Sequence, residues 1–285
     1  GEIVRGLEDI NSHFRSLPRE LKRSDRSALW GMILLTQGIA LATIFPLFGV
    51  VRCHFSDRAA WQVSTLWPLI PALNVFLPKS DTLYPFLTLL LVWCALQGVR
   101  RKSWLWGCST GFVLWLGLSM SLALLPGLVL TLLLVVWEIF TSHRANSQST
   151  RGESSTTSAW SQYIAPIIAM GGSFALLVAL VWWLTDLNLL NCWRMNLQNH
   201  AGFYTQYPRT YWKWLLVNPF ELAIAFGLPV TFAVISSYGR AGVNFRRLPY
   251  AAWGPLVCCP LVWSLLWLSG KNMGEAARLW IFLLP

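Results

Sequence analysis

Apolar runs long enough to cross a membrane follow one another along most of this chain of 285 residues. They cover about 28–51, 60–77, 82–98, 103–118, 120–139, 161–185, 216–238 and 250–269, and a ninth starts near 277. About 20 apolar residues are enough to cross the hydrocarbon core of a bilayer as a helix. The runs therefore predict an all-α fold, a polytopic transmembrane helical bundle of about eight to nine helices over residues 28–285.

Composition agrees with this class, because 55% of the residues are hydrophobic and only 12% are charged. The net charge of +10 does not point to nucleic acid, since no basic cluster falls on a soluble module. An excess of Lys and Arg in cytoplasmic loops explains it more simply. Membrane lipids are thus expected partners and nucleic acid is not.

Residues 1–27 precede the first run and form a separate segment. Apolar residues recur there at three- and four-residue steps, at Ile3, Leu7, Ile10, Phe14 and Leu17. This spacing predicts an amphipathic helix that ends near Pro18 and lies in the headgroup plane. The helix could be a simple interfacial anchor, or Glu8 or Asp9 could project towards an active site. Because the chain begins with Gly1 and ends within an apolar run, we expect it to be an excerpt with membrane segments missing.

Lys and Arg divide unequally between alternate loops, which predicts orientation. The loops near 51–59, 99–103, 140–160 and 239–249 hold ten of them, and those around 78–81, 119, 186–218 and 270–278 hold six. The richer set is predicted to be cytoplasmic. Among these loops, 140–160 is rich in Ser and Thr, which predicts that it is flexible. The segment 186–218 belongs to the other set and is predicted to be an outer loop. The alternation of sides from one span to the next also places the basic N-terminal helix outside, against the rule that basic segments stay in the cytoplasm. The conflict disappears if this helix belongs to a larger translocated loop, to which the rule does not apply.

The predicted outer face gathers most of the candidate functional residues. Asp81 and Glu275 are the candidate catalytic residues, since a carboxylate can deprotonate or orient an acceptor hydroxyl. Candidate residues for binding a phosphate by charge or a sugar by stacking are Arg209, Lys271, Arg278, His200, Tyr204, Tyr211 and Trp212. A plainer interpretation also holds for each: aromatic rings collect at any membrane interface, Arg278 can snorkel, and Asp81 can cap the helix that starts at Thr82.

The sequence lacks the motifs of several other classes of enzyme and cofactor-binding protein. The four His and six Cys show no metal-ligand spacing, so neither a metal nor another cofactor is predicted. The chain contains no Walker loop, no dinucleotide fingerprint and no G-x-S-x-G elbow. It also lacks the Asp-x-Asp clamp with which nucleotide-sugar transferases hold a divalent ion.

Three stretches together resemble a known class of membrane enzymes. They are Leu66-Trp-Pro-Leu-Ile-Pro-Ala72 with Phe76-Leu-Pro-Lys-Ser-Asp81 and Tyr84-Pro85, then Asn199-His200 with Arg209-x-Tyr-Trp, and finally Gly274-Glu-Ala-Ala-Arg-Leu-Trp280. The chain resembles the GT-C class of lipid-dependent glycosyltransferases, including the family 39-like mannosyltransferases. In that class an acidic residue in the first outer loop, just after the first membrane helix, acts as the base or activates the acceptor. The N-terminal amphipathic helix resembles the end of such a loop. We expect the first span and the principal acidic residue of the loop to lie outside this sequence, so Glu8 and Asp9 are not equated with that residue.

The resemblance implies an integral enzyme of a bacterial inner membrane. It would move a sugar from a polyprenyl-phosphate donor to an acceptor at the outer face. A transporter or lipid flippase remains an alternative, in which the same residues form a binding site, although the two halves show no internal repeat. A non-catalytic membrane scaffold is a third.

Overall fold

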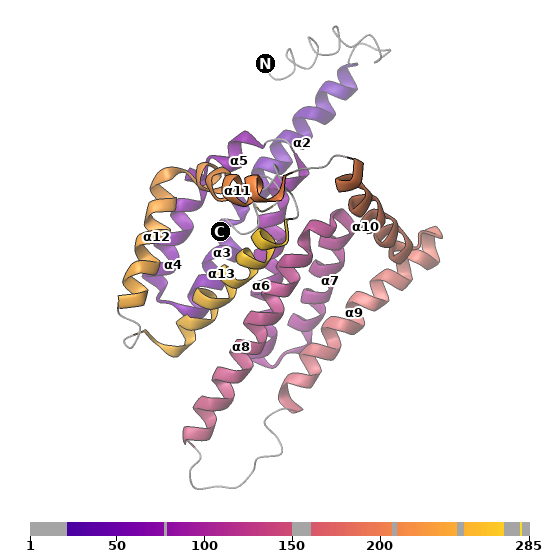
Figure 1. Cartoon of the computed structure of the whole chain (residues 1–285). Helices are drawn as coiled ribbons and strands as arrows, with labels where there is room; N and C mark the ends of the chain where they lie inside the picture. Colours follow the sequence, from indigo (N-terminus) through magenta and orange to yellow (C-terminus); the bar gives the residue numbers. More distant parts are fainter. Residues whose placement is uncertain are drawn as a thin grey trace.

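The computed structural model describes residues 22–76, 79–149, 161–206, 210–243, 248–270 and 280, with the backbone alone at 145–149, 203–206 and 243. Every regular element in these residues is an α-helix or a short 3-10 helix (Figure 1). The α-helices are α2 (Arg23–Ala42), α3 (Ile44–His54), α4 (Asp57–Leu66), α5 (Ala72–Val75), α6 (Tyr84–Arg101), α7 (Trp104–Met120), α8 (Leu125–Ser149), α9 (Ser161–Thr185), α10 (Leu189–Gln206), α11 (Tyr211–Phe226), α12 (Leu228–Val243) and α13 (Trp253–Leu268). The 3-10 helices are η1 (Trp67–Leu69), η2 (Ser80–Leu83), η3 (Leu122–Leu124) and η5 (Tyr250–Ala252). The all-α prediction is confirmed for these residues.

Five helical stretches are long and apolar enough to cross a membrane. They are Arg23–His54, Ser80–Arg101, Leu122–Arg144, Ser161–Thr185 and Tyr250–Leu268. The pair α11 and α12 would make a sixth if its two halves form one broken span, and α7 is apolar but shorter. Such helices fit an integral membrane protein. Within the described residues they are nevertheless fewer than the eight to nine helices predicted.

One predicted span, 60–77, is not a continuous helix. The chain forms α4 over ten residues, then η1, and then the single turn of α5. Pro68 and Pro71 explain the breaks, because a proline donates no backbone N–H and disfavours helix in the residue before it. The indole of Trp67, only 1% exposed, donates a 2.7 Å hydrogen bond to the carbonyl of Ala40 and fixes the broken segment against α2.

A second predicted span, 216–238, is bent by 110° between α11 and α12. The bend lies at Gly227, whose φ of +83° belongs to a region that side chains with a Cβ rarely adopt. A Cβ there would also lie 3.1 Å from Cδ of Pro71. Two breaks that lie far apart in the sequence therefore pack against each other.

Two predicted loops contain helix. α8 continues to Ser149, well into the predicted 140–160 loop, because residues such as Ala145 and Gln148 are compatible with a helix that is already formed. The predicted outer loop 186–218 holds all of α10 and the start of α11. Residues 150–160 lie outside the described part, as does the predicted amphipathic helix up to residue 21.

α7 and α9 make the closest pairing of long helices, through small residues. A Cβ added at Gly107 would collide with the carbonyl oxygen of Pro166, and one at Gly111 with the carbonyl oxygen of Met170 and the hydroxyl of Ser173. This is the Gly-x-x-x-Gly arrangement by which apolar helices approach closely. Among the residues of α9 only Tyr163 and Pro166 are buried, so most of this helix is exposed.

The helix ends gather at two opposite ends of the bundle (Figure 1). At the Asp81 end, the upper one in Figure 1, lie η2, η3, α10 and the start of α11. At the Arg100 end, the lower one, lie the ends of α3, α6 and α8 and the start of α13. The described residues 79–81, 119 and 186–206 thus share one end, and those at 51–59, 99–103 and 140–149 share the other, as the alternation of predicted spans requires. The broken segment 57–76 still returns the chain from the Arg100 end to the Asp81 end.

Candidate functional site

Asp81 lies in η2, just before α6, and is only 9% exposed. The turn that holds it is closed by the hydroxyl of Thr82, which donates a 2.8 Å hydrogen bond to the carbonyl of Lys79. Lys79, and not Asp81, occupies the N-cap position of η2. Leu83 occupies the N-cap position of α6, so Asp81 is at the N-cap of neither helix. Its carboxylate is held largely away from solvent.

Tyr84 connects Asp81 to the end of α7. Its ring is 4% exposed and packs in a core cluster with Leu114, Leu118 and other apolar side chains. Its hydroxyl interacts with the side chains of Ser80, Asp81 and Ser121. Ser121 stands at the break between α7 and η3, where its hydroxyl accepts a 3.1 Å hydrogen bond from the backbone N–H of Ala123. The buried carboxyl of Asp81 thus lies near the first turn of α6 and the residue that caps α7.

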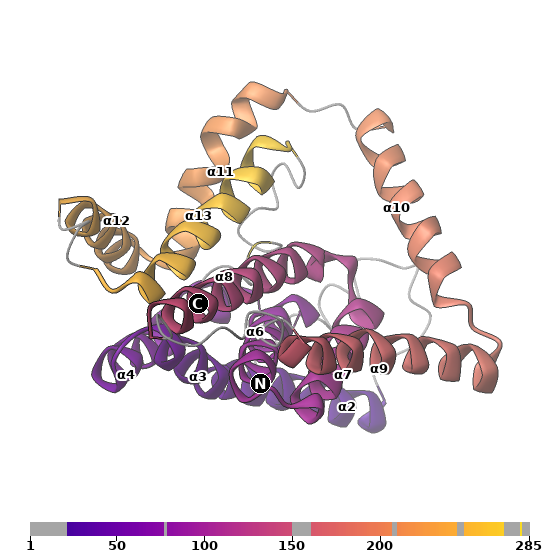
Figure 2. The same ribbon diagram turned by 90° about the horizontal axis from the view of Figure 1, so that it is seen from below.

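The same end of α7 also holds α10. The indole of Trp193 donates a 3.1 Å hydrogen bond to the carbonyl of Leu118, and its ring stacks on Phe174 of α9 with centroids 6.1 Å apart. Figure 2 shows α10 extending from the end of α9, away from α6 and α8. α10 is not among the candidate membrane spans. We interpret it as a helix that projects from this end of the bundle, fixed there through Trp193.

An open hollow of about 560 Å³ lies along the polar side of α10. The described residues that line it are Met195, Asn196, Gln198, Asn199 and Gly202. Three carboxamides in one hollow offer several hydrogen-bond donors and acceptors without a net charge.

The other side of α10 is apolar and open. Leu190 and Leu197, two turns apart and therefore on one side of the helix, are 62% and 52% exposed. A helix with these two sides can contact lipid with one and a polar ligand with the other.

α11 brings two of the predicted aromatic residues, Tyr211 and Trp212, to this end, together with Lys213. Tyr211 donates a 2.8 Å hydrogen bond to the carbonyl of Leu268, at the end of α13, and its ring lies against Gly270. Trp212 is 60% exposed, and Nζ of Lys213 lies 5.8 Å from the centre of its ring. The contacts of Tyr211 hold α11 to α13, whereas Trp212 is open to lipid or ligand.

The structure describes the side chains of only some of the predicted site residues. Those of Asp81, His200, Tyr211 and Trp212 are described and lie at the Asp81 end; His200 is exposed on α10 next to Asn199, and is not among the residues lining the hollow. Tyr204 belongs to α10, but its side chain lies outside the described part. Arg209, Lys271, Glu275 and Arg278 lie outside it entirely. That Arg209, Glu275 and Arg278 line one cavity with Asp81 at the outer face stays a prediction.

Sequence reasoning did not single out Asn196, Gln198 or Trp193, and it quoted Tyr84 only within the stretches that resemble the GT-C class. Asn196 and Gln198 lie within the polar stretch 186–218, so their signal was present in its composition. The contacts of Tyr84 and Trp193 gave no signal, because their partners Ser121 and Leu118 are distant in sequence.

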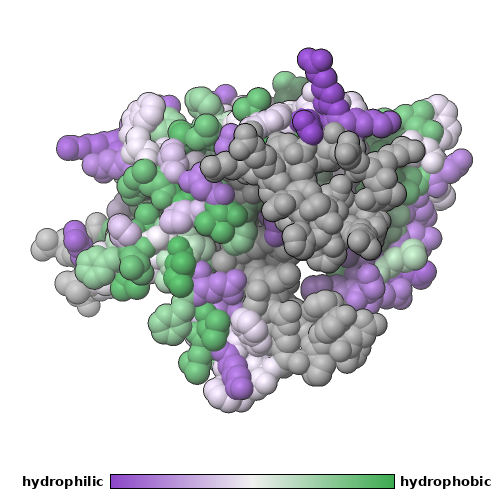
Figure 3. All heavy atoms as spheres, turned by 90° about the horizontal axis from the view of Figure 1, so that it is seen from above, coloured by the Kyte–Doolittle hydropathy of each residue, from purple (hydrophilic) through white to green (hydrophobic). Residues whose placement is uncertain are grey.

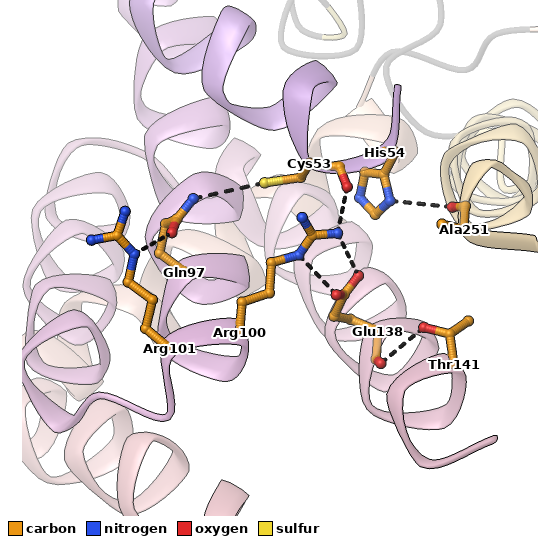
Figure 4. Close-up of polar contacts among 8 residues, drawn as sticks. All are labelled: Cys53, His54, Gln97, Arg100, Arg101, Glu138, Thr141 and Ala251. Atoms are coloured by element: carbon orange, nitrogen blue, oxygen red, sulfur yellow. Dashed lines mark hydrogen bonds and ion pairs between the residues drawn. The ribbon is translucent and has the colours of Figure 1, made fainter. Parts of the chain in front are cut away.

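A second polar cluster lies at the Arg100 end, between α3, α6, α8 and η5 (Figure 4). Nε and an Nη atom of Arg100 donate to the two carboxylate oxygens of Glu138 at 2.8 and 3.0 Å, and the same guanidinium donates to the carbonyl of Cys53. Nδ1 of His54 lies 3.2 Å from the carbonyl of Ala251. The two side chains of the ion pair satisfy each other, so we interpret this cluster as a structural link between four elements.

No group of three His, Cys, Asp or Glu side chains that could hold a metal ion occurs in the part of the chain that the structure describes. Viewed from the Asp81 end, hydrophilic and hydrophobic residues are interspersed over the coloured part of the surface (Figure 3). Comparison of the chain with protein-family models, with curated proteins and with solved structures gives no match. The chain is therefore placed by its own features, as an all-α bundle with helices suited to a membrane.

Proposed function

We propose that this chain is a membrane glycosyltransferase that moves a sugar from a polyprenyl-phosphate donor to an acceptor. The reaction would take place at the Asp81 end, which would face outward from a bacterial inner membrane. The observation that carries the proposal is the hollow of α10. Its carboxamides suit a sugar, and the exposed leucines on the other side of the same helix suit a lipid. A lipid-linked sugar combines these two chemistries in one molecule.

Asp81 is the proposed base, or the group that orients the acceptor hydroxyl. It is the carboxylate that lies in the turn next to the end of α7, to which α10 is attached. Burial in a medium of low dielectric strengthens its interaction with a hydroxyl proton. Glu275 is the second candidate for this role, from the sequence.

The phosphate of the donor would be held by Arg209, Lys271 and Arg278. A departing lipid phosphate needs positive charge, and a guanidinium can donate to two of its oxygens at once. His200, Tyr204 and Trp212 would contact the sugar or the prenyl chain. For Tyr211 we propose a positioning role, because its hydroxyl already binds the carbonyl of Leu268.

The test is transfer from radiolabelled polyprenyl-phosphate sugars in membranes reconstituted with the full-length protein. Asp81→Asn is expected to lower the rate by about 10²- to 10⁴-fold. Arg278→Lys keeps the charge and removes the planar fork, and should cost roughly thirty- to a thousand-fold. Asp57→Asn is the matched control, because it removes a carboxylate at the Arg100 end. This variant should transfer the sugar at the normal rate. Near-native rates for Asp81→Asn, Arg209→Lys and Arg278→Lys together would refute the assignment.

A transporter or lipid flippase is the second candidate. The observation that favours it is the 110° bend between α11 and α12, because broken helices often form the binding sites and gates of transporters. The same vesicles distinguish the two functions. A flippase would move the labelled lipid between leaflets without forming a glycosylated product.

A further inference from the structure

Three arginines at the Arg100 end place their guanidinium groups over aromatic rings. The guanidinium carbon of Arg101 lies 5.6 Å from the ring centre of Trp106, that of Arg144 lies 5.3 Å from Tyr250, and that of Arg52 lies 6.0 Å from Phe48. All three arginines are exposed. We call Arg52, Arg101 and Arg144 the arginine rim. Stacking on a ring leaves the N–H groups at the edge of a guanidinium free to donate.

The members of the rim differ in how their charge is compensated. Arg52 forms a 2.8 Å ion pair with Asp57, much as the neighbouring Arg100 does with Glu138. Arg101 donates to the neutral side-chain oxygen of Gln97 at 2.8 Å. Among the residues that the structure describes, no carboxylate pairs with Arg101 or Arg144. Within the described residues, two planar cations are thus held in place without a carboxylate partner.

The surroundings of the rim have the character of a membrane interface. Trp104 and Tyr250 are 59% and 42% exposed and lie at this end, beside the apolar parts of α7 and α13. Exposed aromatic rings of this kind sit at the level of lipid headgroups. Arg144 stacks on Tyr250 itself, and Arg101 stacks on Trp106, two residues from Trp104, so both arginines lie at the level of these rings.

From these features we infer that the arginine rim binds the headgroups of anionic phospholipids, mainly through Arg101 and Arg144. A phosphate diester offers the paired oxygens that a guanidinium fork matches, and an anionic headgroup supplies the net negative charge that the rim lacks. Lipid is favoured over a soluble acidic protein because the rim borders apolar helix surface. The inference is independent of the proposed transferase, which concerns the opposite end.

The experiment is lipid co-purification. The protein is reconstituted in bilayers of phosphatidylcholine and phosphatidylglycerol, extracted gently, and the retained lipids are quantified by mass spectrometry. Wild type should be enriched in phosphatidylglycerol over the bulk ratio. Arg101→Gln and Arg144→Gln should each lower the enrichment by about fivefold. Trp106→Leu, which keeps both charges and removes one stacking partner, should lower it less.

Arg52→Gln is the matched control, because Arg52 is also exposed and stacked but already has a carboxylate partner. It should leave the enrichment within about twofold of wild type. Equal effects of Arg52→Gln and Arg101→Gln would overturn the inference, since net charge alone would then explain the binding. A wild-type enrichment that survives 1 M salt during reconstitution would overturn it as well, without depending on how any variant folds.

Discussion

Trp193 and Leu118 join α10 to the end of α7 through one hydrogen bond of 3.1 Å, from the indole N–H to the backbone carbonyl. The carbonyl belongs to the last turn of α7, where helix carbonyls lack partners within the helix. The bond therefore satisfies a backbone group and fixes α10 at the same time. Ser121, three residues further on, interacts with Tyr84 and hence with the turn of Asp81. One helix end supports both the candidate base and the hollow.

The first prediction concerns this attachment. Trp193→Phe keeps an aromatic ring against Phe174 and removes the N–H donor, and should cost about 1 kcal/mol of stability. Hydrogen exchange measured by mass spectrometry should become faster in α10 and stay unchanged in α8. Trp183→Phe is the control, because Trp183 is 79% exposed on α9. Equal exchange in α10 for both variants would show that the hydrogen bond does not hold the helix.

A second prediction compares the two ion pairs of the Arg100 end. Glu138→Gln leaves the partly buried guanidinium of Arg100 without a counter-charge, and should lower the free energy of unfolding by about 2 kcal/mol. Asp57→Asn removes the carboxylate of an exposed pair, whose side chains are 60% and 66% exposed, and should change it by less than about 1 kcal/mol. Equilibrium unfolding in mixed micelles measures both values. Similar losses in the two variants would contradict the structural role of Glu138.

A third prediction tests the close approach of α7 and α9. Gly111→Ala places a methyl group against the backbone of Met170, and should cost about 1–3 kcal/mol because the helices must move apart. Gly172→Ala is the opposite case, since nothing lies within 4 Å of its Cβ position. Replacing an exposed helical glycine by alanine should stabilise α9 by about 0.5–1 kcal/mol. Thermal unfolding of the two variants should therefore shift in opposite directions.

The bend between α11 and α12 gives a fourth prediction. Gly227→Ala is strained twice, by its positive φ and by the ring of Pro71, and should cost about 1–3 kcal/mol. Adding Pro71→Ala to Gly227→Ala should recover only the part that is due to the ring. Gly239→Ala in α12, whose Cβ position is open, serves as the control. A Gly227→Ala protein as stable as this control would mean that the bend does not require glycine.

The sequence predicted the long helices well where one apolar run has no break. The run 161–185 matches α9, because Pro166 lies within the first two turns and the rest contains good helix formers. It failed at 60–77 because apolar content alone does not report the breaks at Pro68 and Pro71. Hydropathy also could not reveal that 216–238 turns at Gly227, since both halves are equally apolar.

The candidate site was predictable only in its local part. Asp81 was identified because a carboxylate between apolar runs is conspicuous in a sequence. Glu138 was not identified, because its role is to pair with Arg100, which lies 38 residues away in the sequence. Trp193 was missed for the same reason, as its partner Leu118 is 75 residues distant. Such pairs are set by the packing of helices, which one sequence does not display.

α9 has a consequence for the site that it supports. It is packed chiefly along α7, is otherwise exposed, and carries α10 at its far end. Helices of fixed length adapt to thicker or thinner bilayers by changing their tilt. α10 is also held at the end of α7 by the hydrogen bond between Trp193 and Leu118, so a change in the tilt of α9 would load that bond. We therefore expect the thickness of the surrounding bilayer to act on the hollow through α9, so that lipids of different chain length would affect it without touching it.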